Sequence, residues 1–240
     1  MAKDDLEDRA IDVALHVEEK IESSPYSALV LAETAPPEMA SHPEVRLAKA
    51  RAIAAARGAR AAKAELERLV RDEPDFAEAR HELGLVYEEL GEEAAQSTQM
   101  LQVRELDEAA DHADGFDFER SSQRIVATAR RVLGELPVKW RSRLDEVPII
   151  VEERPSEDIV REGFDPRALG LFEGPNHADR TGVSTYVSPT RIVLYAANLA
   201  AFVAPEDDEE LAAEIEVTLL HEIGHYFGLD EDELEKIGLG

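Results

Sequence analysis

The most informative stretch of the sequence is His221-Glu222-Ile223-Gly224-His225, followed by Tyr226-Phe227-Gly228. Residues four apart lie on one face of a helix, so His221 and His225 can present imidazole nitrogens to one metal ion. Glu222 is about 100° further round the helix and flanks that position. Zinc accepts neutral imidazole and carboxylate ligands, and a catalytic zinc site keeps one position for water. The spacing therefore predicts a zinc site in which Glu222 takes the proton of that water as it attacks a carbonyl group.

The residues around the motif show whether the His-Glu-x-x-His spacing indicates a metal site or a chance pattern. With seven His and 53 acidic residues among 240, a His-acid-x-x-His pattern arises by chance in roughly 4 of 100 such sequences. Residues 207–220 begin with four acidic residues, as a helix N-terminus prefers. Leu211, Ile215 and Leu219 then follow at four-residue spacing. Gly228 stands where such a helix would end, so we expect the motif at the C-terminal end of an amphipathic helix.

A third metal ligand is expected after the motif. Fifteen residues follow His225, which is too short a segment to bring a distant ligand on a long second helix. A helix that ends at Gly228 lets the chain turn back toward the metal, and Glu231 is three residues further on. We therefore expect Glu231 to be the third ligand, with Asp230 and Asp232 as the alternatives.

The motif resembles that of the bacterial minimal zincins, also described as zincin-like metallopeptidases, whose pattern is His-Glu-x-x-His-x-x-Gly-x-x-Asp. Four positions agree, namely His221, Glu222, His225 and Gly228. The last position differs, because this chain has Glu231 where the family has Asp. The resemblance implies a zinc-dependent peptidase in which His221, His225 and Glu231 bind Zn²⁺ and Glu222 is the general base.

The resemblance extends upstream of the motif. Segments 147–155, 169–174 and 191–195 are similar to the family's strand segments in the same order. The resemblance covers about residues 116–240 and implies a small α+β domain with a short sheet and the metal-site helix near the C-terminus. The expected fold class is α+β, with an all-α domain over 1–110 followed by this domain over 116–240.

Local patterns predict the elements of the second half. We expect helices over 119–136, 138–144 and 198–203, strands over 147–151, 168–172 and 187–195, and loops over 155–165 and 173–188. The last strand is expected to have an exposed edge that can add an extended peptide substrate. Tyr186, Tyr195 and Tyr226 are equal candidates to stabilise an oxyanion. His177 is a minor candidate for contact with substrate or metal, and Trp140 is expected to be a core anchor.

Residues 1–110 are predicted to be helical throughout, since Ala, Leu, Glu and Arg dominate and the prolines divide the stretch into helix-length pieces. The segment 77–91 resembles the first helix of a tetratricopeptide repeat, and 44–58 repeats it 33 residues earlier. Residues 59–71 are expected to form the helix between them. Such helix pairs stack and leave one surface free, so a protein partner on the repeats is a further expectation.

Composition excludes several partners. The formal net charge of −27 disfavours nucleic acid and anionic membranes, because the electrostatic term would be repulsive. No Cys is present, which excludes disulfides and thiolate ligands. The first residues contain no apolar signal core, and the longest apolar run, 192–204, is too short to span a bilayer. A cytoplasmic protein is expected.

Two functions remain compatible with the sequence. The first is a zinc metallopeptidase that hydrolyses peptide or protein substrates, with the helical repeats mediating protein interaction. The second is a non-catalytic interaction scaffold whose zinc site is structural or vestigial. A structural site has no need of Glu222, so the complete motif favours the first.

Overall fold

The computed structural model describes residues 3–135, 138, 147–174, 191–203, 207–226 and 228–236, without the side chains of residues 3–5, 231, 232 and 235. The chain divides into two compact units. The first unit comprises Met1–Ala110 with Glu157–Phe164, and the second comprises Asp111–Ser156 with Asp165–Gly240. The described residues of each unit contain their own buried apolar clusters.

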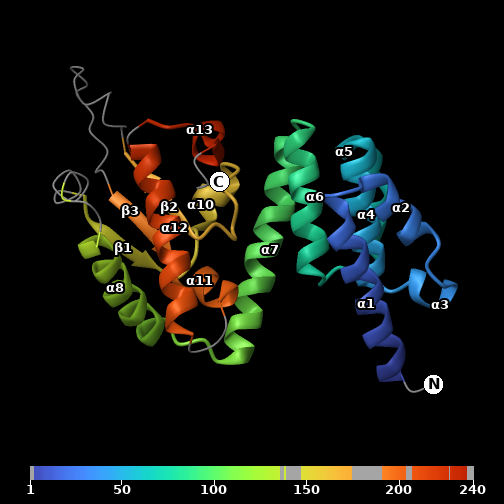
Figure 1. Cartoon of the computed structure of the whole chain (residues 1–240), viewed down its shortest axis with the longest axis horizontal. Coiled ribbons are helices and arrows are strands. Elements are labelled where there is room, and N and C mark those ends of the chain that lie inside the picture. The colour runs from blue at the N-terminus through green and yellow to red at the C-terminus, as the bar shows by residue number, and fades with distance from the viewer. Residues whose placement is uncertain are drawn as a thin grey trace. The chain divides into compact units, whose positions relative to one another are not determined.

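Helices make up all the regular structure described in the first unit (Figure 1). They are α1 (Lys3–Ile21), α2 (Pro25–Glu33), α3 (Pro37–Ala40), α4 (Pro43–Arg57), α5 (Ala59–Asp72), α6 (Ala77–Glu89), α7 (Glu93–Asp114) and the short α10 (Glu157–Arg161). The last turn of α7 belongs to the second unit. The helical character predicted for this part of the chain is therefore confirmed.

Prolines and glycines set the helix boundaries, as the sequence indicates. Pro25, Pro37 and Pro43 each stand at the start of a helix, where a missing N–H costs no hydrogen bond. Gly58 has φ 85° and lies between α4 and α5, a conformation that an L side chain rarely adopts. Helices α4, α5 and α6 match the segments 44–58, 59–71 and 77–91, and their tetratricopeptide-like nature stays a prediction.

One segment of the first unit is separated from the rest in sequence. Residues 155–165 were expected to form a loop, but Glu157–Arg161 forms helix α10. Side chains of α7 hold this segment, since Gln96 donates to the carbonyl of Gly163 and Ser97 to that of Arg161, at 3.4 and 3.2 Å. The loop prediction was wrong because the helix gains its stability from docking, which short local sequence does not show.

The second unit places helices against a three-stranded sheet. Its elements are α8 (Phe118–Glu135), β1 (Ile149–Glu152), β2 (Gly170–Glu173), β3 (Arg191–Tyr195), α11 (Ala196–Phe202), α12 (Asp208–Tyr226) and α13 (Glu231–Lys236). Residues Ile192 and Leu194 of β3 are buried in one apolar cluster with side chains of α8, α11 and α12. The second unit is thus a small α+β unit with α12 packed on the sheet.

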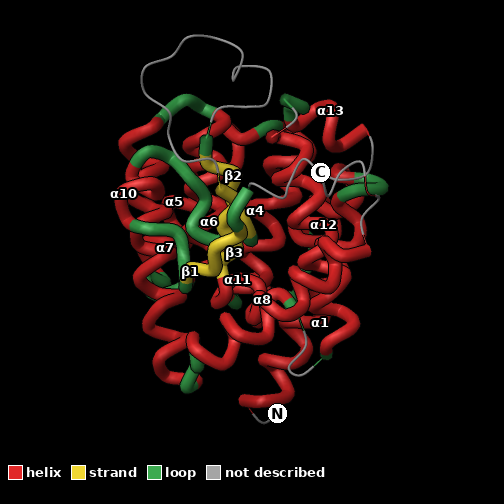
Figure 2. The backbone as a smooth tube through the Cα atoms, turned by 90° about the vertical axis from the view of Figure 1, so that its left-hand side faces the viewer, coloured by secondary structure: helices red, strands yellow, loops and turns green. Residues whose placement is uncertain are grey.

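The strand order is β1-β3-β2, so β3 is central. It pairs in parallel with β1, where Ile149 is opposite Ile192. It pairs in antiparallel with β2, where Gly170 is opposite Leu194. Figure 2 shows the three strands in yellow. The expectation that the last strand offers an open edge to a peptide was wrong for its described part, Arg191–Tyr195, where both edges of β3 are used in pairing.

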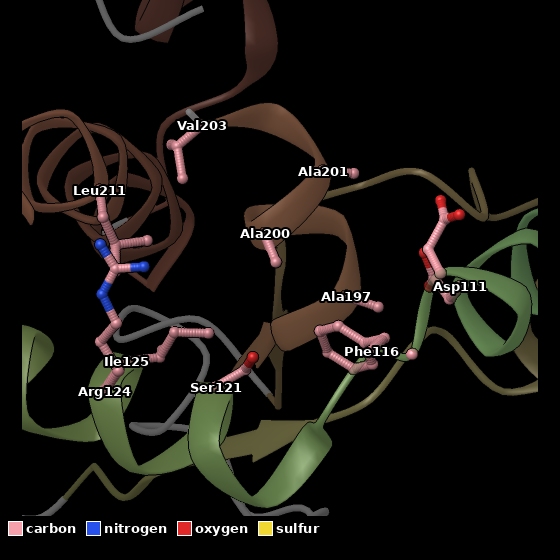
Figure 3. Close-up of a pocket in the computed structure, with 12 residues that line it drawn as sticks. Asp111, Phe116, Ser121, Arg124, Ile125, Ala197, Ala200, Ala201, Val203 and Leu211 are labelled. Carbon is pink, nitrogen blue, oxygen red and sulfur yellow. The ribbon is translucent and has the colours of Figure 1, made fainter. Parts of the chain in front are cut away.

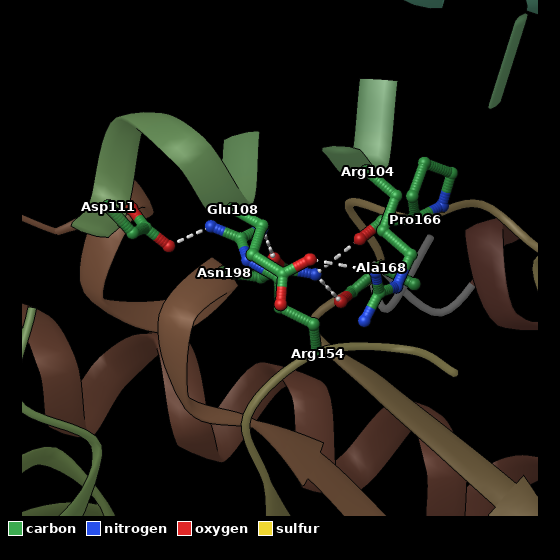
Figure 4. A network of polar contacts seen from close by, with 7 residues as sticks. All are labelled: Arg104, Glu108, Asp111, Arg154, Pro166, Ala168 and Asn198. Carbon is green, nitrogen blue, oxygen red and sulfur yellow. Dashed lines mark hydrogen bonds and ion pairs between the residues drawn. The ribbon is translucent and has the colours of Figure 1, made fainter. Parts of the chain in front are cut away.

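A buried polar network supports the sheet on the side of α11 (Figure 4). Asn198 donates from its amide nitrogen to the carbonyl oxygens of Pro166 and Ala168, at 2.8 and 2.7 Å. Its amide oxygen accepts a hydrogen bond from Arg154 at 2.9 Å. Arg154 also forms an ion pair with Asp111. Because these carbonyls lie just before β2, the network fixes the approach of the chain to that strand.

Some sequence expectations lie outside the described residues. These are the helix over 139–144 with Trp140, the loop over 175–186 with His177 and Tyr186, and the first part of the last strand, 187–190. Among the residues that are described, no helix has both the length and the apolar composition needed to cross a membrane.

Candidate metal centre

Helix α12 carries the motif on its last turns. Asp207 caps the first turn, because its Oδ1 accepts hydrogen bonds from the backbone N–H groups of Glu209 and Glu210, at 3.0 and 2.9 Å. At the other end, Gly228 has φ 85° and its N–H donates to the carbonyl of His225 at 2.9 Å. The N–H of Leu229 donates to the carbonyl of Gly224 at 3.1 Å. This pair of bonds is the Schellman motif, which ends the helix where the sequence predicts.

The two histidines of the motif converge. Nε2 of His221 and Nε2 of His225 are 2.9 Å apart, with ring centroids separated by 4.6 Å and ring planes at 81°. Two nitrogens bound to one tetrahedral zinc at about 2.0–2.1 Å lie about 3.3 Å apart. The rings therefore need to separate by only about 0.4 Å to fit two positions of such a site.

The orientation of His225 is fixed by the turn that follows α12. Its Nδ1 is 3.1 Å from the carbonyl oxygen of Leu229. A carbonyl oxygen can only accept, so Nδ1 carries the hydrogen and Nε2 of the neutral ring keeps its lone pair. Metal-binding histidines are held by such a second hydrogen bond. Leu229 was not singled out from the sequence, because its carbonyl and not its side chain makes the contact.

Glu222 is 6% exposed and lies close to β2. The contact between Glu222 and β2 depends on Gly170. A Cβ atom at this position would lie 2.8 Å from Cγ2 of Thr218, 3.1 Å from the carbonyl oxygen of Val193 and 3.4 Å from Cγ of Glu222. The absent side chain of Gly170 therefore allows α12 to approach the sheet at the level of Glu222. The sequence did not indicate this role.

Helix α13 packs Leu234 against α12 at Gly224. Leu234 is fully buried, and a Cβ atom at Gly224 would overlap its Cδ2. Asp230 caps α13, since its Oδ1 accepts from the N–H of Glu233 at 2.9 Å while its own N–H donates to Oε2 of Glu233 at 3.1 Å. This reciprocal pair is a capping box. The Asp-x-x-Glu spacing is visible in the sequence, where the acids were considered only as ligands.

The expected third ligand, Glu231, is the first residue of α13, and its side chain lies outside the described ones. The same holds for the side chain of Asp232. Among the side chains that the structure does describe, no three His, Asp or Glu residues form a metal-binding group. The described part of the centre consists of His221, His225 and the neighbouring Glu222.

Two of the tyrosine candidates can be placed. Tyr226 is 2% exposed and its ring packs edge-on against Phe172, with centroids 5.7 Å apart. Tyr195 is fully buried at the end of β3, where its strand neighbour is Glu152. Because side chains alternate along a strand, Tyr195 is on the face opposite Leu194, whereas Leu194 packs with α12. Burial, together with the nearby carboxylates, raises the pKa of Tyr195.

A cavity of about 470 Å³ lies elsewhere in the second unit (Figure 3). It is bordered by the end of α7 and the turn after it, by α8 and α11, and by the first turn of α12, and its lining includes Phe116, Arg124, Ala200 and Leu211. Leu211 precedes His225 by fourteen residues, which is about 21 Å along a helix. The cavity is therefore separate from the metal centre.

Comparison with known proteins agrees with the motif in the second half of the chain. A search of curated proteins found no match. The model of a protein family matches from residue 144 to the C-terminus, so that α8 and residues 1–110 of the first unit lie outside the match, whereas the segment Glu157–Phe164 of that unit lies within it. Residues 144–240 match the family described as zincin-like metallopeptidase.

Proposed function

We propose that the second unit is a zinc-dependent peptidase with its active site at the end of α12. The observation that carries the proposal is the convergence of Nε2 of His221 and His225 at 2.9 Å, next to the buried Glu222. The family match over residues 144–240 also supports it. Substrates of this class are peptides or proteins.

We assign the metal ligands to His221, His225 and Glu231. His225 is supported by its hydrogen bond to Leu229, which leaves Nε2 as the lone-pair donor. Glu231 is preferred to Asp230 because one carboxylate oxygen of Asp230 already caps α13. Asp232 remains the alternative. Bound zinc would supply a Lewis acid that polarises the scissile carbonyl and acidifies a water molecule.

Glu222 is assigned as the general base. Its carboxylate would accept the proton of the attacking water and then deliver it to the leaving amine. The side chain of Glu222 is buried at 6% exposure, and Glu222 directly follows His221 on α12. The close approach of Gly170 limits how far Glu222 can move toward the sheet.

The test is a comparison of wild type with Glu222→Gln. The amide keeps the shape of the side chain but cannot take a proton, so hydrolysis of an unstructured protein should fall by about 10²–10⁴. Zinc content, measured by elemental analysis, should be unchanged. His225→Ala should instead lose zinc. If wild type binds zinc through His225 but, like Glu222→Gln, cleaves nothing, the non-catalytic scaffold becomes the better account.

We also propose that the first unit, over about residues 1–110, is an interaction module. Its helices α4, α5 and α6 cover the segments in which the repeat is expected, and stacked helix pairs commonly expose one face to a protein partner. This role is independent of the metal centre.

A further inference from the structure

Three helices of the first unit are joined across one surface by a single side chain. Arg51 of α4 donates from Nε to Oε2 of Glu82 on α6 at 2.8 Å. The same guanidinium donates from Nη1 to Oε1 of Glu18 on α1 at 2.5 Å. Helix α4 is therefore flanked by α1 and α6. We define the α1–α4–α6 face by Glu18, Arg51 and Glu82. It also includes the positions on the same three helices that lie three, four or seven residues before or after these residues.

Large apolar side chains are exposed on this face. Leu15 and Ile11 precede Glu18 by three and seven residues, and they are 52% and 39% exposed. Leu85 follows Glu82 by three residues and is 39% exposed. Residues at these spacings share one side of a helix. The face thus offers apolar contact area on both helices that flank α4.

The same face is strongly acidic. In register with the three bridged positions are the glutamates Glu18, Glu44, Glu78, Glu82 and Glu89. The one cation among the register positions, Arg51, is already engaged by two of them. Burial and the neighbouring Glu78 raise the pKa of Glu44, so the carboxylates are close enough to oppose one another's charge.

We propose that the α1–α4–α6 face binds a peptide segment of a protein partner in which Lys or Arg alternates with apolar residues. The Lys or Arg side chains of the peptide pair with the glutamates of the face. The apolar side chains of the peptide cover Ile11, Leu15 and Leu85. A second copy of this chain fits less well, because its net charge of −27 would oppose contact. The proposal rests on the interaction role of the first unit and not on zinc or hydrolysis.

The test is fluorescence anisotropy of labelled twelve-residue peptides with the full chain at 150 mM salt. One peptide alternates Arg and Leu, a second has Ser in place of Leu, and a third has Glu in place of Arg. The Arg-Leu peptide should bind saturably, the Arg-Ser peptide more weakly and the Glu-Leu peptide not at all. Parallel titrations with Glu222→Gln show whether any change in anisotropy comes from cleavage of the peptides.

Matched variants separate the face from diffuse charge attraction. Glu78→Gln with Glu89→Gln should weaken binding of the Arg-Leu peptide about fivefold. Leu15→Ser with Leu85→Ser should weaken it about tenfold. The control pair Glu38→Gln with Glu73→Gln removes the same charge from exposed positions outside the face and should change binding less than about twofold.

Three outcomes would overturn the proposal. They are no saturable binding by wild type, an equal loss in the control pair, and unchanged binding in the Leu→Ser pair. Circular dichroism of each variant checks that the helices persist. None of these outcomes affects the peptidase proposal, whose test measures zinc and hydrolysis.

Discussion

Nδ1 of His225 and the carbonyl oxygen of Leu229 are joined by a hydrogen bond of 3.1 Å across the end of α12. The bond exists because the chain reverses at Gly228, whose φ of 85° brings Leu229 back over the last turn. One glycine therefore determines both where the helix ends and which nitrogen of His225 faces the proposed metal.

Gly228→Ala should weaken zinc binding as well as stability. The left-handed conformation costs an L side chain about 1–2 kcal/mol, and a shifted turn would withdraw the Leu229 carbonyl. Loss of such a supporting bond typically lowers metal affinity by about 10–100-fold. Zinc titration with a competing chelator measures this effect. Gly134→Ala is the control, because Gly134 is in α8 with open space around it, and this variant should keep wild-type affinity.

Gly170→Ala should impair hydrolysis more than zinc binding. The new methyl group would press on Cγ2 of Thr218 and on the carbonyl oxygen of Val193 and would touch Cγ of Glu222, whereas no histidine atom is among these three nearest atoms. Overpacking of this kind costs about 1–3 kcal/mol. Adding Thr218→Ser removes the closest methyl group and should restore part of the stability in urea unfolding. A double variant that is no more stable than Gly170→Ala would mean that the carbonyl of Val193 sets the limit.

Substitutions of the acids after the motif should show that Glu231 is a metal ligand and that Asp230 caps helix α13. Asp230→Ala removes the capping bond to Glu233 and should destabilise α13 by about 0.5–2 kcal/mol. Asp230→Ser can still cap, so it should behave like wild type. Glu231→Ala should instead lower zinc affinity in both wild-type and Asp230→Ser backgrounds. If Asp230→Ser alone lowers zinc affinity, Asp230 is the ligand and Glu231 is not.

The boundaries of α2, α3, α4 and α12 were predictable because their signals are local. Proline at the start of α2, α3 and α4, and glycine after α4 and α12, mark the boundaries directly. The spacing of Leu211, Ile215 and Leu219 likewise predicted which side of α12 is buried. These features depend on neighbouring residues only, so one sequence is enough to detect them.

The features that were missed depend on contacts between distant segments. The central place of β3 is set by pairing with strands more than 15 residues away in sequence. Helix α10 depends on Gln96 and Ser97, and the role of Gly170 depends on Thr218. No local pattern encodes such contacts. The roles of His221, Glu222, His225 and Glu231 stay predictions until they are measured.

Tyr87 should make stability fall at alkaline pH. Its hydroxyl group donates to Glu67 at 3.1 Å, and burial followed by this carboxylate raises the pKa of Tyr87 to about 12. In the unfolded chain a tyrosine titrates near pH 10, at its ordinary pKa of about 10. The folded state therefore keeps a proton that the unfolded state releases, so stability is fully present below pH ~10 and is lost as pH rises toward ~12.

Tyr87→Phe removes both the hydrogen bond and this pH dependence. At pH 8 the variant should be less stable than wild type by about 0.5–1.5 kcal/mol. Between pH 10 and pH 12 the wild type should lose stability faster, so the two free energies of unfolding should converge. Urea unfolding followed by circular dichroism measures the difference. Tyr26→Phe is the control, because Tyr26 is 67% exposed, and it should follow wild type at every pH. A gap between wild type and Tyr87→Phe that stays constant from pH 8 to pH 12 would contradict the raised pKa.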